Sequence, residues 1–359
     1  MSRYWSDIVS KLTPYTPGEQ PQIQDLIKLN TNENPYGPSP KVIQAISNVN
    51  NEGLRKYPDP TALNLKKTIA EYYSHHNISS DNVFVGNSSD EVLAHVFRGL
   101  LKKSKPLLFP DITYSFYPVY CDLFGIDYQT VPLQKDFTIN IKDFPANNGG
   151  IIFANPNAPT GLGLDIDQLT KLLDTHPDSV IVIDEAYIDF AEGDIRTAVE
   201  LISEYDNLLV TQTLSKSRNL AGLRVGLALA HPDLIDGLER VKNSFHPYAL
   251  DALALAGAEA AFKDIEYFQE CSLKVKTTRK KFTKKLLELG FNVLDSSANF
   301  VFASHKGHNA RSLFEGLREK KIIVRYFDKP RLDQFLRISI GTEDEMQACA
   351  IALQELTKL

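Results

Sequence analysis

Short runs of consecutive apolar residues alternate with longer amphipathic segments over the first two thirds of the chain. The strand-like runs are NVFVG (82–86), PLLFP (106–110), GGIIFANP (149–156), SVIVIDEAY (179–187), NLLVTQTLS (207–215) and VGLALA (225–230). Helical periodicity occurs before and between these runs, at 41–49, 62–76, 87–101 and 165–176. Continuous apolar strands that alternate with helices predict a mainly parallel sheet sandwiched by helices.

The two ends of the chain have different patterns. The first 35 residues are polar and interrupted by prolines, which predicts an extended arm, although DLIKLN (25–30) has strand character. After residue 250, long helical segments precede short strand-like runs, which predicts a smaller α+β domain. We therefore expect an α/β protein with an arm at 1–35, a large domain at 36–250 and a small domain at 251–359.

Length and charge restrict the class of protein. A chain of 359 residues suggests two domains of unequal size. The formal net charge is −6, whereas nucleic-acid-binding proteins are usually basic or carry a basic face. The densest basic run, KVKTTRKKFTKK (274–285), lies in a helical pattern that closes near Gly290, and we interpret it as a solvated helix face. We expect no nucleic-acid partner.

The cysteines and the N-terminus indicate the compartment. Cys121, Cys271 and Cys349 lie far apart, without the spacing of a metal or redox motif. The N-terminus lacks the apolar segment of a signal peptide, and no stretch of about 18 apolar residues occurs. We expect a soluble, cytoplasmic protein of a reducing compartment, with no membrane partner.

Two histidine pairs suggest metal ligands, His75 with His76 and His305 with His308. No third ligand is placed beside either pair by spacing, so that loop histidines are the better interpretation. We expect no metal site.

A helix start follows the first strand of the large domain. In GNSSDE (86–91), Ser88 and Glu91 have the spacing of a capping box. The free backbone N–H groups of a helix start suit an anion such as a phosphate. Alone this signal is weak, because any capped helix has it.

Two further strands end in polar residues. The turn NPNAPTG (155–161) has a backbone restricted by two prolines and a glycine, and it presents Asn157, although it is equally an ordinary tight turn. Asp184 ends the strand VIVID, where a carboxylate is either solvated or a buried anion that holds a cation. Tyr187 follows shortly afterwards.

The stretch TLSKSRNLAGLRVG (213–226) places Lys216 between two serines and Arg224 between two nearby glycines. Taken singly, both residues are ordinary surface charges. Asn157, Asp184, Lys216 and Arg224 follow one another at intervals of about one strand-and-helix or strand-and-turn unit. They can therefore meet at one edge of the sheet.

This combination suits one kind of chemistry. A lysine can act as a nucleophile when its amine is deprotonated, which burial or neighbouring cations favour. A cofactor with a pyridine ring needs a carboxylate to keep its ring nitrogen protonated. It also needs donors to its ring hydroxyl, and phosphate ligands from a helix start, from Ser or Thr and from an arginine. The sequence contains each part.

These motifs carry a resemblance that runs nearly end to end. The chain resembles fold type I pyridoxal-phosphate enzymes of the aminotransferase superfamily, and more narrowly the histidinol-phosphate aminotransferase family. NPxxPTG and SK…GLR are signals of the superfamily, whereas NENPYGPSP with KYPDP and DEAYIDF is much narrower. Two positions depart from the pattern: Ser88 stands where glycine is common, and Ala158 where a second asparagine is common. Neither change removes a side chain with an assigned role.

The resemblance implies how pyridoxal 5′-phosphate would be held. Lys216 would bind the cofactor covalently and then move the proton, and Asp184 would pair with the ring nitrogen. Asn157 and Tyr187 would hydrogen-bond the ring hydroxyl. The remaining cofactor ligands would be Tyr114, stacked on the ring, and the phosphate ligands Ser89 and Asp90 (through backbone N–H), Thr213, Ser215 and Arg224.

The resemblance also implies a homodimer with shared active sites. The arm at 1–35 would join the small domain and the partner subunit, and Tyr57 would reach the phosphate in the neighbouring subunit. Arg337, helped by Arg325 and Tyr15, would meet the substrate phosphate. The same arginine would bind the α-carboxylate of glutamate, because a planar guanidinium suits both anions. The implied reaction converts L-histidinol phosphate and 2-oxoglutarate to imidazole-acetol phosphate and L-glutamate, in histidine biosynthesis.

Three alternatives stay open at this point. An aromatic amino-acid aminotransferase and a threonine-phosphate decarboxylase on the same scaffold would both keep the cofactor residues. A cofactor-binding regulator would keep the fold without turnover. Such regulators commonly add a DNA-binding domain, for which an arm of about 35 residues is too short, and the intact Lys216 also argues against this class.

Overall fold

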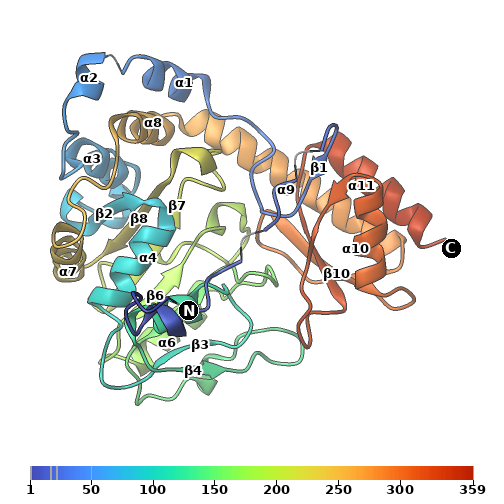
Figure 1. Ribbon diagram of the computed structural model, residues 1–359, viewed down its shortest axis with the longest axis horizontal. Helices are drawn as coiled ribbons and strands as arrows, with labels where there is room; N and C mark the ends of the chain where they lie inside the picture. The colour runs from blue at the N-terminus through green and yellow to red at the C-terminus, as the bar shows by residue number, and fades with distance from the viewer. Residues whose placement is uncertain (1, 17, 22, 50, 359) are drawn as a thin grey trace.

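The computed structural model describes residues 2–16, 18–21, 23–49 and 51–358. It contains a seven-stranded sheet, a four-stranded sheet and a two-stranded sheet. The two larger sheets lie in two parts of the molecule, and the long helix α9 (Ile265–Glu288) runs from one part to the other (Figure 1).

The larger sheet has the strand order β2-β8-β7-β6-β5-β3-β4. Its strands are β2 (Val83–Asn87), β3 (Leu107–Pro110), β4 (Tyr128–Val131), β5 (Ile151–Ala154), β6 (Ile181–Asp184), β7 (Leu208–Thr213) and β8 (Val225–Ala230). Neighbours from β7 to β4 are parallel, whereas β8 is antiparallel to both β2 and β7. The prediction of a mainly parallel sheet is confirmed. The edge strand β4 was missed because its residues are polar and mostly exposed, without an apolar run.

Helices cover both faces of this sheet. One face carries α4 (Ser88–Gly99), α5 (Tyr117–Phe124) and α7 (Pro232–Asn243). The other carries α3 (Leu63–Tyr72), α6 (Ile166–Thr175) and α8 (Ala252–Lys263). Helices α1 (Pro40–Ser47) and α2 (Asn51–Arg55) lie at the upper left of Figure 1, where α1 packs against α8.

The central strands are buried on both faces. Ile181 and Ile183 of β6 point into the core beneath α3, α6 and α8, whereas Val182 points into the core beneath α4, α5 and α7. All three side chains are almost fully excluded from solvent. This burial is the reason for the continuous apolar runs in the sequence. Polar side chains are therefore displaced to the ends of these strands, where the candidate site lies.

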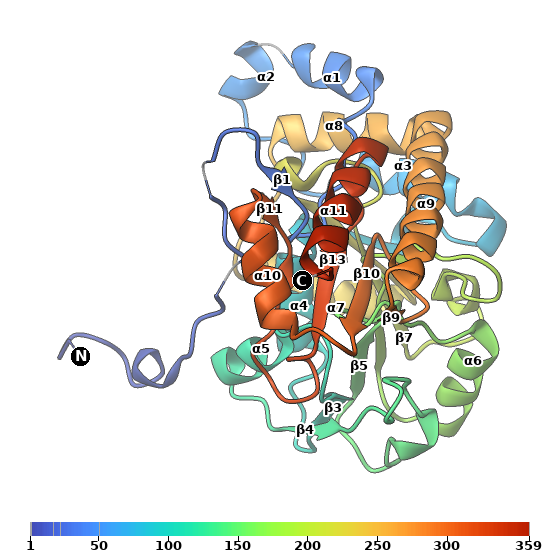
Figure 2. The same ribbon diagram turned by 90° about the vertical axis from the view of Figure 1, so that its right-hand side faces the viewer.

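The smaller part contains the antiparallel sheet β12-β13-β10-β9. Its elements are β9 (Phe291–Val293), β10 (Phe300–His305), β12 (Arg325–Tyr326), β13 (Phe335–Ser339), α10 (Ala310–Glu319) and α11 (Glu343–Leu356). Figure 2 shows α10, α11 and α9 packed in front of the strands. Their facing side chains form a second apolar core.

The N-terminal segment is built into this smaller part. Strand β1 (Ile27–Lys28) pairs in parallel with β11 (Ile322–Ile323), and Leu29 lies in the second core. Both chain ends thus contribute to the small α+β part, as the fold prediction required. The domain boundary at residue 250 stays a prediction, and α8, which follows it, packs in the core of the large sheet.

One local expectation was wrong, and a second holds only in part. Asn87, not Ser88, is the N-cap of α4, and the predicted capping box between Ser88 and Glu91 does not form: Glu91 accepts the N–H of Asn87 at 2.5 Å. In the basic run, Arg279 is buried and donates to the backbone oxygens of Phe190 and Ala298 at 2.9 and 2.6 Å. This arginine therefore joins α9 to two loops instead of facing solvent.

Candidate active site

The predicted residues gather at the carboxyl edge of the large sheet. Asp184 is the last residue of β6, Thr213 is the last of β7, and Asn157 lies in the turn after β5. Because β8 runs in the opposite direction, Arg224, just before its first residue, lies at this same edge. The parallel strands and one reversed strand thus bring together residues that are far apart in the sequence.

Asp184 is a buried carboxylate with only neutral donors. Its two oxygens accept the hydroxyls of Tyr117 at 3.0 Å and Thr211 at 3.2 Å. Burial raises the pKa of the Asp184 carboxyl from its ordinary value to about 6, although both hydroxyls oppose the shift. In the described part of the chain no lysine or arginine pairs with it. The strand end is therefore not solvated, and its charge lacks a cation.

Asn157 is held in a rigid turn. Its side-chain nitrogen donates to the backbone oxygen of Ile112 at 3.0 Å and to the Thr160 hydroxyl at 3.2 Å. Its side-chain oxygen accepts the Thr113 hydroxyl at 2.9 Å. The residue is 1% exposed, and the peptide bonds that precede Pro156 and Pro159 are cis. The amide is thus oriented by its neighbours, and a ring hydroxyl would have to compete with Thr160 for one N–H.

Lys216 lies in the loop that follows β7. Its Nζ donates to the backbone oxygen of Thr31 at 3.1 Å and lies 5.9 Å from the centre of the Tyr187 ring. Asn34 donates to the backbone oxygen of Lys216 at 3.0 Å. The amine is therefore placed at the junction of the large sheet and the N-terminal segment.

The N-terminal segment 30–34 is the main feature that the sequence interpretation missed. Its backbone oxygen at Asn30 accepts from the Arg337 guanidinium at 2.9 Å, and Asn32 donates to the Tyr187 hydroxyl at 3.1 Å. Together with the contacts of Thr31 and Asn34 to Lys216, this one segment touches three predicted site residues. The available signal was the density of asparagines in LNTNENP, which is too polar for an ordinary strand end.

The first turn of α4 lies directly beside β8. A Cβ on Gly226 would lie 2.3 Å from the backbone nitrogen of Ser89, so that only glycine allows this approach. The N–H of Asp90 points at the Ser88 hydroxyl at 3.2 Å. The helix start therefore presents its backbone donors toward the edge where Arg224 lies.

Hydroxyls and an arginine complete this polar corner. Thr213 donates to Ser215 at 3.0 Å, and the N–H of Ser215 donates back to Thr213 at 3.2 Å. Arg224 pairs with the Asp90 carboxylate at 3.0 Å across a half-exposed gap. An anion bound here would share Arg224 with Asp90, while the hydroxyls and the helix start supply neutral donors.

Aromatic rings form one wall of the site. Tyr114 donates to the Asp90 carboxylate at 3.1 Å and meets Tyr117 edge to face with ring centres 5.5 Å apart. Burial, followed by the charge of Asp90, raises the pKa of the Tyr114 hydroxyl far above its usual range, so that it stays protonated. Tyr117, which the sequence interpretation did not single out, is the donor to Asp184 described above.

Two arginines face each other on neighbouring strands of the small sheet. Arg325 of β12 and Arg337 of β13 are directly paired in the antiparallel register. Burial lowers the pKa of the Arg337 guanidinium, and the charge of Arg325 acts in the same direction. The Nε of Arg337 is buried and has no partner among the described residues. Two like charges in this position are costly unless an anion binds between them or beside them.

Tyr15 and Tyr57 occupy different environments. Tyr15 lies against Phe116, with ring centres 5.0 Å apart, and its phenol is close enough to influence the pKa of the Arg337 guanidinium, which places it near the arginine pair. Tyr57 is 81% exposed and stacks on Tyr248 at 4.6 Å. In the described part of the chain, the ring contact of Tyr57 is thus with a residue outside the predicted site.

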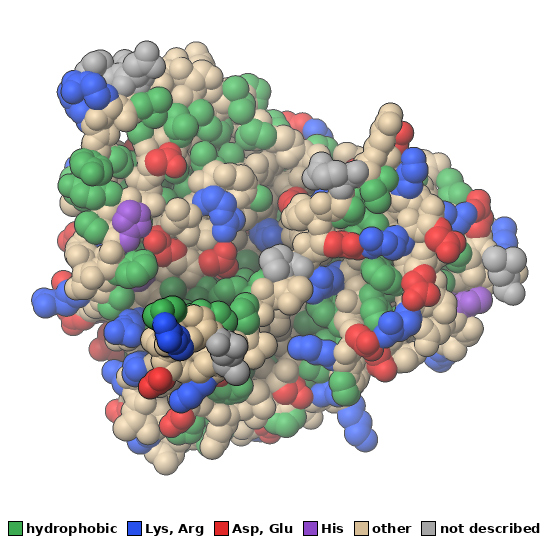
Figure 3. Space-filling model, viewed as in Figure 1, with side chains coloured by type: hydrophobic (Ala, Val, Ile, Leu, Met, Phe, Trp, Pro, Cys, Tyr) green, Lys and Arg blue, Asp and Glu red, His purple; other side chains and the backbone are tan. Residues whose placement is uncertain are grey.

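The part of the surface that carries α1 and α2 exposes apolar side chains. Apolar side chains gather on and below α1 and α2 in Figure 3. Exposed large apolar residues in this region of the sequence and in the segment after α7 include Ile43, Leu54, Tyr57, Phe245 and Tyr248. Exposed aromatic clusters of this kind usually mark an interaction surface.

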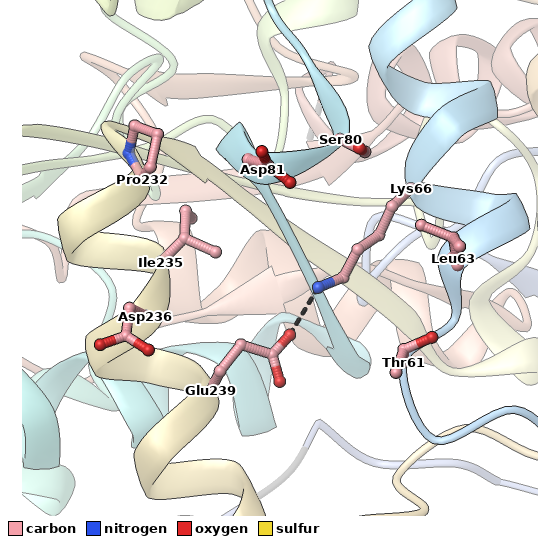
Figure 4. Close-up of a pocket in the computed structure, with 9 residues that line it drawn as sticks. All are labelled: Thr61, Leu63, Lys66, Ser80, Asp81, Pro232, Ile235, Asp236 and Glu239. Carbon is pink, nitrogen blue, oxygen red and sulfur yellow. Dashed lines mark hydrogen bonds and ion pairs between the residues drawn. The ribbon is translucent and has the colours of Figure 1, made fainter.

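A separate surface hollow of about 320 Å³ lies between α3 and α7. Figure 4 shows that Lys66 and Glu239 pair across it, at 2.5 Å. None of the predicted site residues lines it. The candidate site is therefore assigned from the converging polar groups and not from this hollow.

Among the described residues no group of three His, Cys, Asp or Glu side chains is arranged to hold a metal ion. His305 and His308 lie together, with ring centres 4.7 Å apart, and a ring nitrogen of His305 contacts the backbone oxygen of Leu289. No helix in the described ranges has the length and apolar character needed to cross a membrane.

Comparisons with known proteins identify the family of the chain. Residues 24–353 match the family model for aminotransferase class I and II. The chain is 56% identical over 356 residues to histidinol-phosphate aminotransferase 1 of Pseudomonas fluorescens, which covers 99% of this chain and all of the relative. It is 55% identical over 361 residues to histidinol-phosphate aminotransferase 2 of Dechloromonas aromatica, with 99% and 100% covered.

Solved structures show the same fold. The histidinol-phosphate aminotransferase of Sinorhizobium meliloti, solved in complex with pyridoxal-5′-phosphate, has a TM-score of 0.89 at 24% identity, covering 100% of this chain and 98% of that chain. The enzyme from Clostridium acetobutylicum has a TM-score of 0.85 at 23% identity, with 93% and 99% covered.

Proposed function

The chain belongs to the class I and II aminotransferase family and, within it, to the histidinol-phosphate aminotransferases, and from this we propose its reaction. It is a pyridoxal-phosphate-dependent transaminase of histidine biosynthesis. It moves the amino group of L-histidinol phosphate to 2-oxoglutarate and releases imidazole-acetol phosphate and L-glutamate. The carrying observation is full-length identity above one half to relatives with this activity in their names.

The residues present fit the cofactor. Asp184 is a carboxylate whose pKa is raised by burial, and among the described residues no lysine or arginine pairs with it. A protonated ring nitrogen would supply the positive charge. The Thr213 and Ser215 hydroxyls, the start of α4 and Arg224 form a donor set for a phosphate. Lys216 would hold the group covalently. When bound, the cofactor would act as an electron sink: it would accept the electron pair that remains when the bond between the substrate carbon and its α-hydrogen breaks.

The side chains of this site have separable tasks. The Lys216 amine, when it is not bound to the cofactor, would take the proton from the substrate carbon and deliver it to another atom. It would therefore serve first as general base and then as general acid. Asp184 would keep a proton on the ring nitrogen by its negative charge. Asn157 and Tyr187 would bind the ring hydroxyl, and Tyr114 would lie against the ring.

The arginine pair supports an anion site that two different substrates can use. Among the described residues the buried Nε of Arg337 has no partner, and Arg337 lies opposite Arg325. A bound phosphate or carboxylate would therefore stabilise both guanidinium groups. L-histidinol phosphate brings a phosphate and no carboxylate, whereas glutamate brings carboxylates. A planar guanidinium can form paired hydrogen bonds with either group.

A half-reaction tests the function directly. L-Histidinol phosphate is added to the cofactor-loaded protein without any keto acid, and the visible absorption of the bound cofactor is followed. We expect rapid loss of the band and one imidazole-acetol phosphate per site. If only aromatic amino acids consume the band, or if threonine phosphate releases CO₂, then the scaffold assignment stands and the substrate assignment fails.

Arg337→Lys tests the shared anion site. Lysine keeps the charge but loses the planar pair of donors, so we expect kcat/KM to fall about 100-fold. The loss should appear with both L-histidinol phosphate and glutamate in steady-state assays. Arg196→Lys, an exposed arginine paired with Glu200, is the matched control. A loss confined to one substrate would refute shared use of Arg337.

We also propose a homodimer with shared sites, in which Tyr57 reaches the cofactor phosphate of the partner subunit. The supporting observations are its 81% exposure and its stacking on the partly exposed ring of Tyr248. A hybrid dimer tests this, with one Lys216→Ala subunit and one Tyr57→Ala subunit, purified by two different tags. One of its two sites then has both Lys216 and Tyr57, so we expect about half of the wild-type activity per dimer.

The opposite arrangement, in which Tyr57 serves its own subunit, predicts a different activity for the hybrid dimer. If Tyr57 served its own subunit, the only site with Lys216 would lack Tyr57, and the hybrid would be no more active per lysine-containing site than the Tyr57→Ala homodimer. The assay is run at a cofactor concentration that leaves this homodimer largely unloaded. Sedimentation equilibrium of the wild-type chain checks the dimer itself.

A further inference from the structure

Asn32 sits at the centre of a buried hydrogen-bond network. Its backbone N–H donates to the Ser339 hydroxyl at 2.9 Å, and that hydroxyl donates to the Asn32 side-chain oxygen at 2.8 Å. Asn299 donates to the Asn32 backbone oxygen at 2.9 Å. The remaining group, the Asn32 side-chain nitrogen, donates to the Tyr187 hydroxyl at 3.1 Å.

These contacts favour one orientation of the Asn32 amide. The Ser339 hydroxyl accepts the backbone N–H with one lone pair and donates its only proton to the amide oxygen. A flipped amide would lose the bond from this proton and would place an oxygen, in place of a donor, against the phenol. Asn32 is 1% exposed and has a φ of 57°, a conformation in which asparagine is enriched.

The orientation of the amide determines where the phenol proton goes. Because Asn32 donates to the Tyr187 oxygen, a lone pair of that oxygen is occupied, and the Tyr187 proton has to be donated elsewhere. Tyr187 also lies beside the Lys216 amine, which is 5.9 Å from its ring centre. We propose that Asn32 is a positioning residue that directs the Tyr187 hydroxyl proton toward the ring oxygen of the cofactor.

The same network links this proton to the small domain. Ser339 ends β13, two residues after Arg337, and Asn299 directly precedes β10. The strand that carries the substrate arginine and its neighbour in the sheet therefore also hold Asn32. The neighbours Thr31 and Asn34 contact Lys216. Asn32 is thus the point where the small domain fixes the hydrogen-bond direction of a cofactor ligand. The inference rests on the proposed function, because it needs the cofactor.

Asn32→Asp is the main test. The aspartate keeps the shape and can still accept from Ser339, but its other oxygen accepts the phenol proton instead of donating to the phenol oxygen. We expect kcat to fall about 10- to 100-fold, with KM within about threefold of wild type, because a hydrogen bond to a charged group is lost. Asn292→Asp, the same change at an exposed position of β9, is the matched control.

A readout without substrate separates this role from folding. The visible band of the bound cofactor is titrated with pH in the wild type, Asn32→Asp and Ser339→Ala. A donor to the ring oxygen stabilises its anionic form, so its loss should move the titration midpoint upward by about one pH unit in Asn32→Asp. Ser339→Ala frees the amide to flip, and we expect a smaller shift in the same direction.

A double-mutant cycle with Tyr187→Phe decides whether Asn32 acts through this hydroxyl. We expect Asn32→Asp to cause no further loss of kcat and no further midpoint shift in the Tyr187→Phe background. Additive effects would overturn the proposal, as would an unchanged midpoint in Asn32→Asp. The titration needs no substrate, so an error in the substrate assignment leaves it valid. If the wild-type protein showed no cofactor band at all, the proposed function and this inference would fall together.

Discussion

Lys216→Ala is expected to reduce turnover at least ~10⁴-fold, because the same amine both binds the cofactor covalently and moves the proton. The Lys216 amine donates to a backbone oxygen, that of Thr31, so the loss of this amine should leave the fold intact. The cofactor can still bind through Asp184 and the phosphate ligands. Steady-state transamination and thermal unfolding are measured on the same preparation.

Lys67→Ala, an exposed lysine of α3, controls for the loss of one positive charge. The covalent link is checked by borohydride reduction followed by peptide mass spectrometry. The wild type should carry the cofactor mass on the peptide that contains Lys216, and the variant should carry none. Near-normal transamination by Lys216→Ala would refute the central assignment of this site.

Asp184→Asn is expected to lower kcat about 1,000-fold, because a neutral amide no longer holds the proton on the ring nitrogen. The variant keeps the size of the side chain and retains an oxygen that can accept from Tyr117 or Thr211. Asp167→Asn, an exposed position of α6, is the matched control. An unchanged rate of proton abstraction would mean that another group protonates the ring.

The pH dependence of cofactor binding tests the same carboxyl independently of catalysis. Its pKa is raised to about 6 in the cofactor-free protein, so that it binds a proton below that pH. A cation can pair only with the ionised form, and binding must then release the proton. We expect cofactor affinity to fall up to tenfold per pH unit below about pH 6 and to level off above it.

Asp184→Asn isolates this effect, because the phosphate of the cofactor titrates in the same way in both proteins. The variant should lack the part of the pH dependence that belongs to Asp184. Equilibrium titrations of the cofactor-free proteins between about pH 5 and pH 8 measure the difference. Identical profiles for wild type and variant would show that Asp184 does not pair with the cofactor.

Much of the large domain follows from local pattern. The apolar runs that contain β5, β6 and β7 are buried on both faces, so their composition alone indicated a helix-covered, mainly parallel sheet. The edge strand β4 gave no such signal, because only one of its residues is buried. The N-cap of α4 shows a similar limit, since it lies at Asn87 and not at the predicted Ser88, and its position depends on how β2 meets the helix.

The sequence by itself determined the family of this protein and the chemistry of its reacting groups. It also predicted Lys216, Asp184 and Arg224 as site residues, because a nucleophile, a ring partner and a phosphate ligand each require a particular functional group. Only the tertiary structure decided that Asp184 is buried and that, among the described residues, it has no cation beside it and the buried Nε of Arg337 has no partner. It also placed Asn32 between Tyr187 and Ser339, which are both distant from it in sequence. Burial and hydrogen-bond direction depend on neighbours that the chain brings together only by folding, and for this reason local pattern could not supply them.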